Sequence, residues 1–330
     1  MSYIDGKTIL ITGGTGSFGQ KFVEIILKEH NPKAIRIFSR GEFLQYEMQK
    51  RIQDDRLRFL IGDVREERRI FRAMNGVDVV VHTAALKQVS ACEYNPMEAV
   101  RTNIEGTTNV IDSAINNKVS KVLAISTDKA VHPVNLYGGT KLVLEKLCIQ
   151  ANVYSANTRL SCVRYGNVAG SRGSVIPSFL EESKTGQITI TDPRMTRFWM
   201  TLEKGVRFAI DCIDMMEGGE IFVPRLPSMK IVDLAAAVNM EAKINFIGIR
   251  PGEKLHEILV TQEESRHAMD CGEYFTIYPE MALWRGKEDT YKAKGMALKQ
   301  DFEYTSDGNK WWLSSSDLVY AISEFRKWKS

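Results

Sequence analysis

The chain has 330 residues, of which 44% are hydrophobic and 26% charged, a composition that is typical of an ordered globular protein with one large domain or two moderate ones. A formal net charge of +3 gives no indication of a nucleic-acid-binding surface, and no run approaches the ~18 apolar residues that a membrane-spanning helix needs. Five scattered cysteines without a CxxC pair argue against a disulfide framework and against a metal site, and they indicate a cytoplasmic protein.

Short apolar runs alternate with helix-length segments in the first half of the chain. Strands that are nearly continuous Val, Ile and Leu are buried on both faces, as in a parallel sheet. Alternation of such strands with helices predicts a doubly wound, Rossmann-like α/β fold, in which ligands bind at the carboxyl edge of the sheet. The expected strands are residues 8–12, 35–38, 57–61, 77–81, 121–125 and 160–164, with a first helix at about 18–28.

After about residue 166, glycine and proline become more frequent, which predicts a smaller second lobe. A helix at 202–216 is expected to return to the sheet. We therefore predict a nucleotide-binding domain of residues 1–166 and 197–221, interleaved with a substrate-binding lobe of residues 167–196 and 222–330. The sequence after residue 280 adds no recognisable motif.

A glycine-rich segment, TGGTGSFG at residues 12–19, connects the first expected strand to the first expected helix. Its glycines allow a tight turn and a close approach of the backbone to a pyrophosphate, whose charge is favourable at a helix N-terminus. This context makes a dinucleotide site a better explanation than a plain glycine-rich turn. The expected cofactor contacts here are Gly13, Thr15, Gly16, Ser17, Phe18 and Gly19.

The end of the second strand indicates which dinucleotide is bound. In NAD-binding folds an acidic residue about 20 positions after the glycines binds the ribose 2′-hydroxyl. This chain has Ser39 and Arg40 instead, and a hydroxyl with a guanidinium suits the 2′-phosphate of NADP. A solvated surface arginine is the alternative, and Glu42 nearby leaves NAD open.

Two further strand ends supply expected cofactor contacts. Asp63 is expected to accept a hydrogen bond from the adenine amino group, with Val64 against the ring. The small Ala84 and Ala85 let a ribose lie against the backbone. Lys87 is within reach of either the cofactor or the substrate.

A YxxxK pair, Tyr137 and Lys141, follows the fifth strand. Residues four apart share one face of a helix, so an ammonium beside the phenol would favour the phenolate. The phenolate would take the proton of a substrate hydroxyl while a nicotinamide accepts the hydride. Chance occurrence of the pattern is the alternative.

The fifth strand ends in Thr127, Asp128 and Lys129. Thr127 matches the hydroxyl partner that is usual in Tyr/Lys redox sites. A carboxylic acid next to a lysine of lowered pKa suits the elimination of water, because one group removes a carbon-bound proton and the other protonates the departing hydroxyl. A salt-bridged surface pair is the alternative. A 4-epimerase or a reductase needs no such pair, and a regulator that only binds NADP(H) needs no catalytic tyrosine.

Eight motifs carry a resemblance to a known family: TGGTGSFG, GDVR, ALKQV, STDKA, NLYGGTK, RYGNVAGSRGSVIP, DPRMTRFW and RPGEKLHE. From about residue 4 to 280 the chain resembles the C5-inverting UDP-N-acetylglucosamine 4,6-dehydratases, extended short-chain dehydrogenases/reductases that start bacterial pseudaminic acid synthesis. The resemblance implies that Tyr137 and Lys141 form the redox pair, that Asp128 is the acid, and that Lys129 is the base at C5. It also implies substrate contacts by Lys87, Asn167, Arg197, Arg250 and Glu253.

The implied reaction needs no metal and gives UDP-2-acetamido-2,6-dideoxy-β-L-arabino-hexos-4-ulose. The resemblance implies a homo-oligomer. C5-retaining dehydratases carry Glu where this chain has Lys129, and this difference favours inversion. Retention of C5 and 4-epimerisation are the alternative outcomes. Gly41 and Gly139 depart from the family pattern without removing a reactive group. His82 ends a buried strand and is expected to be a hydrogen-bonded core histidine.

Overall fold

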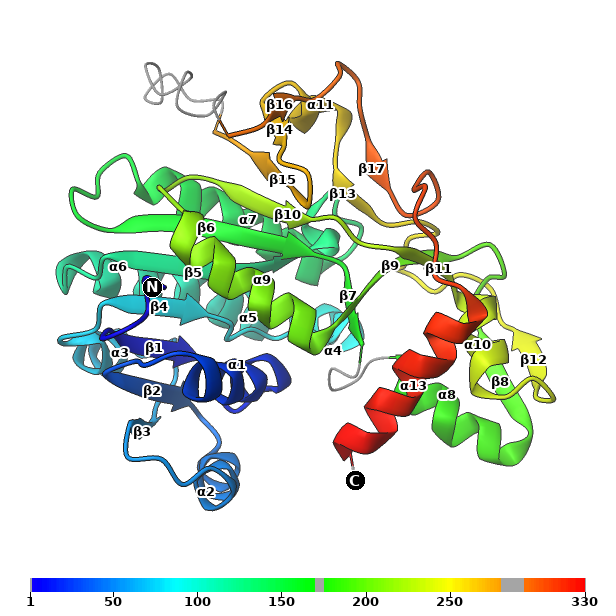
Figure 1. The fold of residues 1–330 in the computed structure, drawn as a ribbon, viewed down its shortest axis with the longest axis horizontal. Coiled ribbons are helices and arrows are strands. Elements are labelled where there is room, and N and C mark those ends of the chain that lie inside the picture. The colour runs from blue at the N-terminus through cyan, green and yellow to red at the C-terminus, as the bar shows by residue number, and fades with distance from the viewer. Residues whose placement is uncertain (1, 170–174, 280–293, 330) are drawn as a thin grey trace.

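Within residues 2–169, 175–279 and 294–329, which the computed structural model describes, a ten-stranded sheet runs through the centre of the protein (Figure 1). The strands from β10 through β6, β5, β4, β1 and β2 to β3 are all parallel to their neighbours. The doubly wound parallel sheet is therefore confirmed, and its six predicted strands are β1 to β6. Their bounds are β1 Thr8–Thr12, β2 Ala34–Ser39, β3 Leu57–Ile61, β4 Val79–His82, β5 Lys121–Thr127, β6 Arg159–Tyr165 and, beside them, β10 Ile221–Pro224.

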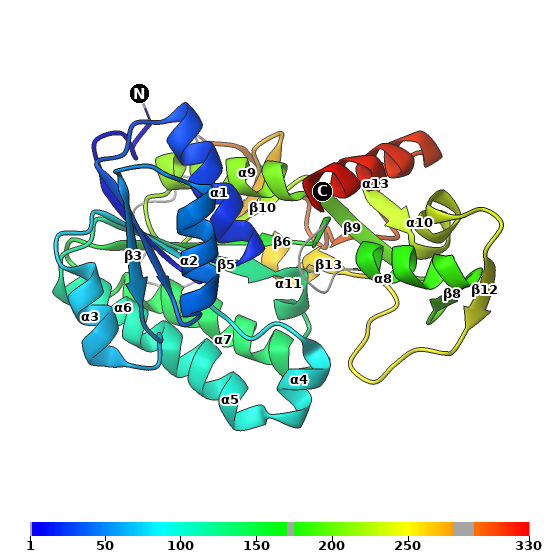
Figure 2. The same ribbon diagram turned by 90° about the horizontal axis from the view of Figure 1, so that it is seen from below.

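Helices cover both faces of this sheet (Figure 2). On one face α1 (Ser17–Glu29) packs beside α9 (Leu202–Met215), so the predicted return of a helix to the sheet is confirmed. On the other face α3 (Glu67–Met74) and α7 (Leu136–Ala151) flank α6 (Gly106–Asn116). Every residue of β1 is buried between these layers, which explains the three apolar residues at its centre, Ile9, Leu10 and Ile11.

The sheet continues antiparallel beyond β10. The added strands are β15 (Tyr274–Ile277), β14 (Ala268–Asp270) and β16 (Met296–Ala297). Residue 222 is the predicted boundary between the two domains, and segments from both sides of it share this sheet. The boundaries of the two predicted domains remain a prediction.

A second hydrophobic core lies beside the sheet. Around it lie α8 (Val175–Glu182), α10 (Ile231–Val238) and α13 (Ser315–Lys329). The buried Leu318 and Ile322 of α13 belong to this core. The C-terminal segment, for which the sequence offered no role, therefore completes the second lobe.

Small sheets connect the second lobe to the carboxyl edge of the large one. β9 (Thr196–Thr201) pairs with β7 (Asn167–Ala169) and with β11 (Ser228–Lys230). β13 (Ile258–Val260) pairs with β17 (Tyr304–Thr305). β8 (Gln187–Ile190) pairs with β12 (Lys243–Phe246). Gly170 and Gly173 of the RYGNVAGSRGSVIP motif lie outside the described residues.

All five cysteines are free, as their spacing predicts. Within the described ranges, no helix has both the length and the apolar character to cross a membrane.

Candidate active site

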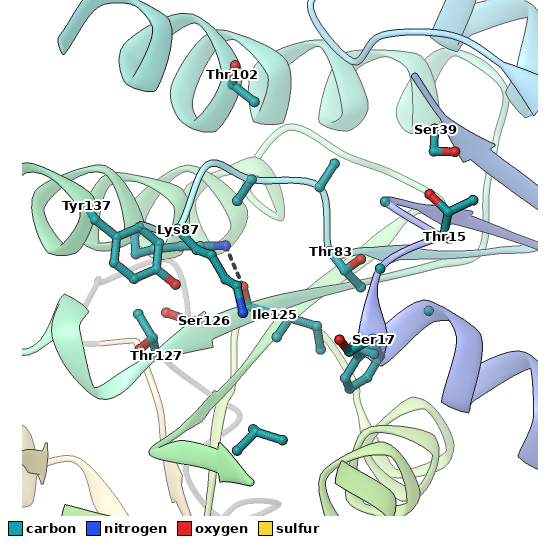
Figure 3. Close-up of a pocket in the computed structure, with 18 of the residues that line it drawn as sticks. Thr15, Ser17, Ser39, Thr83, Lys87, Thr102, Ile125, Ser126, Thr127 and Tyr137 are labelled. Carbon is teal, nitrogen blue, oxygen red and sulfur yellow. Dashed lines mark hydrogen bonds between the residues drawn. The ribbon is translucent and has the colours of Figure 1, made fainter. Parts of the chain in front are cut away.

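The carboxyl ends of β1 to β6 border a cavity of about 580 Å³. Figure 3 shows Thr15 and Ser17 at one end of it and Thr127 and Tyr137 at the other. Every residue predicted to bind the dinucleotide lines this cavity, although contact with a cofactor stays a prediction. They are Gly13, Thr15, Gly16, Ser17, Phe18, Gly19, Ser39, Arg40, Asp63, Val64, Ala84, Ala85, Lys87, Tyr137 and Lys141.

The glycine-rich turn leaves no room for a side chain at Gly13 or Gly19. Gly13 has a φ of +66°, and a Cβ there would lie 2.8 Å from Thr83 Oγ1. A Cβ on Gly19 would lie 2.5 Å from the backbone of Gly14, so α1 starts in direct contact with the turn. The first turn of α1 carries no acidic residue. The side-chain-free turn and the N-terminus of α1 that follows it fit a pyrophosphate.

At the far end of β2, Arg40 is half exposed, and its Nη1 lies 3.7 Å from Asp63 Oδ2. Asp63 is held mainly by Arg65, whose Nε and Nη2 donate to Asp63 Oδ2 at 2.9 and 2.7 Å. Burial alone would raise the pKa of Asp63, but the hydrogen bonds from Arg65 lower it. Sequence reasoning missed Arg65. The adenine contact of Asp63 remains a prediction.

A π-helical turn, η1 (Arg101–Glu105), fixes the loop after β4. The buried Asn103 accepts a hydrogen bond from Leu86 N at 2.8 Å and donates to Leu86 O at 2.9 Å. It also donates to Thr140 Oγ1 on α7. Ala85 and Lys87, the neighbours of Leu86, are thereby placed against the cavity.

α7 begins close to the end of β5. Asn135 caps the helix by accepting a hydrogen bond from Gly138 N at 2.8 Å. A Cβ on Gly138 would collide with the carbonyl oxygen of Lys129, so glycine is required there. A Cβ on Gly139 would meet nothing within 4 Å, so the departure from the family pattern at this position is sterically neutral.

Tyr137 and Lys141 both face the cavity from α7. Burial raises the pKa of Tyr137 to about 12, while the charge of Lys129 and a hydrogen bond with Thr127 oppose the rise. Burial lowers the pKa of Lys141 to about 8, and its Nζ donates to Ile125 O at 2.7 Å (Figure 3). The charge of Lys129 thus opposes the rise in the pKa of Tyr137, and the role of Lys141 beside the phenol stays a prediction.

Asp128 and Lys129 form an ion pair in η2 (Asp128–Ala130), directly after β5. Asp128 is fully buried, and its Oδ1 accepts hydrogen bonds from Thr127 Oγ1 at 2.9 Å and from Lys129 Nζ at 3.0 Å. Burial alone would lower the pKa of Lys129, but Asp128 and Glu257 raise it above its usual range. The expectation of a lowered lysine pKa is therefore wrong for this resting arrangement, because two carboxylates face the ammonium.

Glu257 is a site residue that sequence reasoning missed, although it directly follows the histidine of the RPGEKLHE motif as its final residue. Its Oε1 lies 3.5 Å from Lys129 Nζ and 3.7 Å from Arg197 Nε. Lys254 Nζ lies 3.9 Å from its Oε2 and donates to the Val131 carbonyl. The motif therefore brings charge from the second lobe to the end of β5.

The predicted substrate residues divide into two groups. Asn167 lines the cavity, and its buried Oδ1 has no hydrogen-bond partner among the described residues. Arg197 on β9 donates from Nη1 to Thr196 O and Leu255 O, so its guanidinium is already held. Arg250 is exposed, and Glu253 lines a separate cavity of about 460 Å³. Lys87 also lines the main cavity, whereas the structure does not bring Arg197, Arg250 or Glu253 to its lining.

His82 is hydrogen-bonded at both ring nitrogens, as predicted. Nδ1 lies 2.8 Å from Thr12 Oγ1 and Nε2 lies 3.0 Å from Thr107 Oγ1. The Thr107 hydroxyl already donates to Asn103 O, so it accepts from His82 Nε2. Burial lowers the pKa of His82 to about 3, which keeps the ring neutral.

Comparison with known proteins adds three relatives and a family. The sequence profile of a family described as polysaccharide biosynthesis protein matches residues 9–279. A Campylobacter jejuni (strain 81-176) protein named UDP-N-acetylglucosamine 4,6-dehydratase (inverting) is 46% identical over 327 residues, 97% of this chain and 98% of that protein. A Rickettsia rickettsii protein named UDP-glucose 4-epimerase is 48% identical over 315 residues, 92% of each chain. The X-ray structure of Pen from Bacillus thuringiensis superposes with a TM-score of 0.89 at 39% identity, covering 98% of this chain and 99% of that one.

Proposed function

The chain belongs to the polysaccharide biosynthesis protein family, and from that premise we propose that it is an NADP-dependent UDP-N-acetylglucosamine 4,6-dehydratase that inverts C5. The observation that carries the proposal is the Asp128–Lys129 pair, joined at 3.0 Å at the end of β5, where Lys129 lines the cavity together with Tyr137 and Asp128 is buried behind it. Water elimination needs an acid and a base at this place, and simple alcohol oxidation does not.

The cavity fits a dinucleotide. The backbone turn at Gly13 and Gly19 suits the pyrophosphate, and the end of β2 offers Ser39 and Arg40 where an NAD enzyme would carry a carboxylate. When bound, the nicotinamide supplies a hydride acceptor for C4 of the sugar and a hydride donor for C6. The 2′-phosphate is the natural partner of the half-exposed Arg40 guanidinium.

Tyr137 is the base for the C4 hydroxyl in this proposal. Thr127 lies near its phenol ring (Figure 3), and the positive charge of Lys129 favours its ionised form. Lys141, four residues along the same face of α7, extends into the cavity and would hold the cofactor ribose.

Asp128 and Lys129 then perform the elimination. Transfer of one proton along their 3.0 Å contact converts the resting ammonium and carboxylate into an amine and a carboxylic acid. The amine removes the C5 hydrogen that the C4 ketone acidifies, and the acid protonates the C6 hydroxyl as it leaves as water. As hydride returns to C6, a proton from water is added to C5 on the face opposite Lys129, which inverts that centre.

The second lobe would hold the rest of the substrate. Asn167 offers an unpaired amide oxygen to the sugar, and Arg197 is expected near the diphosphate. Arg250 and Glu253 would reach the phosphate and the uridine ribose only if their loop moves toward the main cavity. The product is a precursor suited to pseudaminic acid synthesis.

A proton NMR time course with UDP-N-acetylglucosamine in D₂O tests the proposal. A new C6 methyl signal, deuterium at C5 and the couplings of an L-arabino ring are expected. Couplings of a D-xylo ring would keep the dehydratase and overturn the inversion. No methyl signal from folded protein with NADP⁺ would overturn the dehydratase.

A second candidate is a UDP-sugar 4-epimerase, which the Rickettsia rickettsii relative's name favours. An epimerase returns the hydride to C4, so it forms no methyl group. Incubation with UDP-glucose and measurement of UDP-galactose separates the two activities. The Asp128–Lys129 pair favours the dehydratase.

A further inference from the structure

Glu257 lies between the second lobe and the end of β5, and hydrogen bonds hold its backbone there. Its carboxylate is buried, with 3% of the residue exposed. Its backbone N donates to Ser306 Oγ at 2.9 Å, and Ser306 N donates back to Glu257 O at 2.8 Å. The backbone position of Glu257 is therefore set by the fold, and its buried Oε2 has no hydrogen-bond partner among the described residues.

Four charged groups face this carboxylate. Asp128 and Lys129 come from η2, Arg197 from β9, and Lys254 from the segment before β13. Burial and Asp128 raise the pKa of Glu257, whereas the three cations oppose the rise. Of these cations, Lys129 is the closest, at 3.5 Å from Oε1.

We propose that Glu257 is a positioning residue for Lys129, which orients its Nζ toward the substrate and stabilises the ammonium that forms when Lys129 takes a proton from carbon. The inference rests on the proposed function. In Ser-His-Asp enzymes a buried carboxylate orients the catalytic imidazole and stabilises the imidazolium that forms. The inference gives Glu257 the same role toward the amine and the ammonium of Lys129.

The charges of the proposed step balance without an added reactant. The C5–H bond breaks and an N–H bond forms on Lys129, while the electron pair moves toward the C4 ketone oxygen. Lys129 becomes an ammonium between Asp128 and Glu257. A fixed negative charge 3.5 Å away stabilises that ammonium more than it stabilises the neutral amine.

The alternative is that Glu257 only joins the lobes through Arg197 and Lys254. Both roles predict some loss of activity when Glu257 is changed. Only the positioning role predicts that the loss falls on C5 proton removal, that it depends on the presence of Lys129, and that it alters the pH profile.

The test compares Glu257→Gln, Glu257→Asp and wild-type protein. The matched control is Glu220→Gln, a carboxylate with 2% exposure that bonds Ser161 at the opposite end of β6. C4 oxidation is measured by the near-ultraviolet absorbance of reduced cofactor after rapid mixing with UDP-N-acetylglucosamine. C5 proton removal is measured by deuterium incorporation from D₂O.

We expect Glu257→Gln to slow C5 deuteration by about 100-fold with little change in C4 oxidation. The rate of C5 deuteration should rise with pH, and this rise, the pH limb, should move to lower pH in Glu257→Gln. The reason is that one of the two carboxylates that raise the pKa of Lys129 is gone. Glu257→Asp should recover part of the rate. In a Lys129→Met background, Glu257→Gln should add no further loss.

Equal slowing of both steps with an unchanged pH limb would overturn the inference and leave Glu257 as a structural link. If Glu257→Gln fails to fold, Glu257→Asp takes its place in the test. A ratio of the C5 deuteration rate to the C4 oxidation rate equal to that of wild type, with an unchanged pH limb, would then overturn the inference. A wild-type protein that oxidises C4 without ever deuterating C5 would instead overturn the proposed function.

Discussion

Arg164 and Glu145 form a buried ion pair with two hydrogen bonds, from Nε to Oε1 at 2.9 Å and from Nη2 to Oε2 at 2.8 Å. The pair joins β6 to α7, the helix that carries Tyr137. The hydroxyl of Ser126, the residue before Thr127, donates from Oγ to the same carboxylate at 2.6 Å. Glu264 binds the other side of the guanidinium. This pair therefore fixes α7 against the end of β5.

Replacing Arg164 should destabilise the whole protein. Arg164→Met leaves the buried Glu145 and Glu264 without their counter-charge, so we expect a loss of about 3–5 kcal/mol in the free energy of unfolding. Urea denaturation measures it. Arg207→Met, which removes exposed ion pairs with Glu29 and Glu203, is the control and should change the value by about 1 kcal/mol or less. Similar losses in both variants would contradict the argument.

The cofactor side of the site could be predicted because parallel strands end at one edge. Gly13, Arg40, Asp63 and Ala85 each follow a recognisable strand, so their convergence needs only the strand order. Glu257 could not be placed, since its approach to the end of β5 depends on how the second lobe folds back.

The charge state of Lys129 was mispredicted for the same reason. The sequence shows its neighbour Asp128 but not the distant Glu257, and together these two carboxylates reverse the expected direction of the pKa shift. The C-terminal helix α13 escaped notice because its apolar face is recognisable only once α8 and α10 are in place.

His82 should make the protein sensitive to acid. Its folded pKa of about 3 lies below the unfolded value of about 6.5, so the unfolded chain binds more protons between these values. Stability is thus fully present above about pH 6.5 and is lost as the pH falls toward 3. Urea denaturation at about pH 7 and about pH 5 should show a smaller difference for His82→Gln than for wild type. An equal difference would remove His82 as a cause.

Arg40 should distinguish the two dinucleotides. Arg40→Ala removes the guanidinium at the end of β2, so we expect NADPH to bind about 10-fold more weakly, with NADH binding nearly unchanged. Fluorescence titration with both cofactors measures the effect. Arg58→Ala, whose side chain bonds backbone carbonyls of Asp55 and Leu57, is the control. An equal effect on both cofactors would argue against 2′-phosphate recognition.

Asp128 should be needed for elimination and not for oxidation. Asp128→Asn cannot accept the proton of Lys129 or give one to the C6 hydroxyl, so methyl formation should fall by at least about 100-fold. Reduced cofactor should still appear on addition of substrate. Asp233→Asn, an exposed carboxylate on α10, should behave as wild type. Unchanged methyl formation in Asp128→Asn would assign the acid to another group.

Tyr137 should be needed for the first step, and therefore for every later one. Tyr137→Phe removes only the phenol oxygen, so folding and cofactor binding should persist while C4 oxidation falls by at least about 100-fold. C5 deuteration should disappear with it, because that hydrogen is acidic only beside a C4 ketone.

The pH dependence gives an independent check on the same residue. Burial raises the pKa of Tyr137 to about 12, so the phenol is protonated near neutral pH and the phenolate fraction grows as the pH rises. Wild-type C4 oxidation, followed by cofactor absorbance, should therefore accelerate with pH, and the residual rate of Tyr137→Phe should stay level. Tyr154→Phe, at an exposed residue that does not line the cavity, should retain the wild-type profile. A Tyr137→Phe rate that still rises with pH would transfer the role of base to another residue.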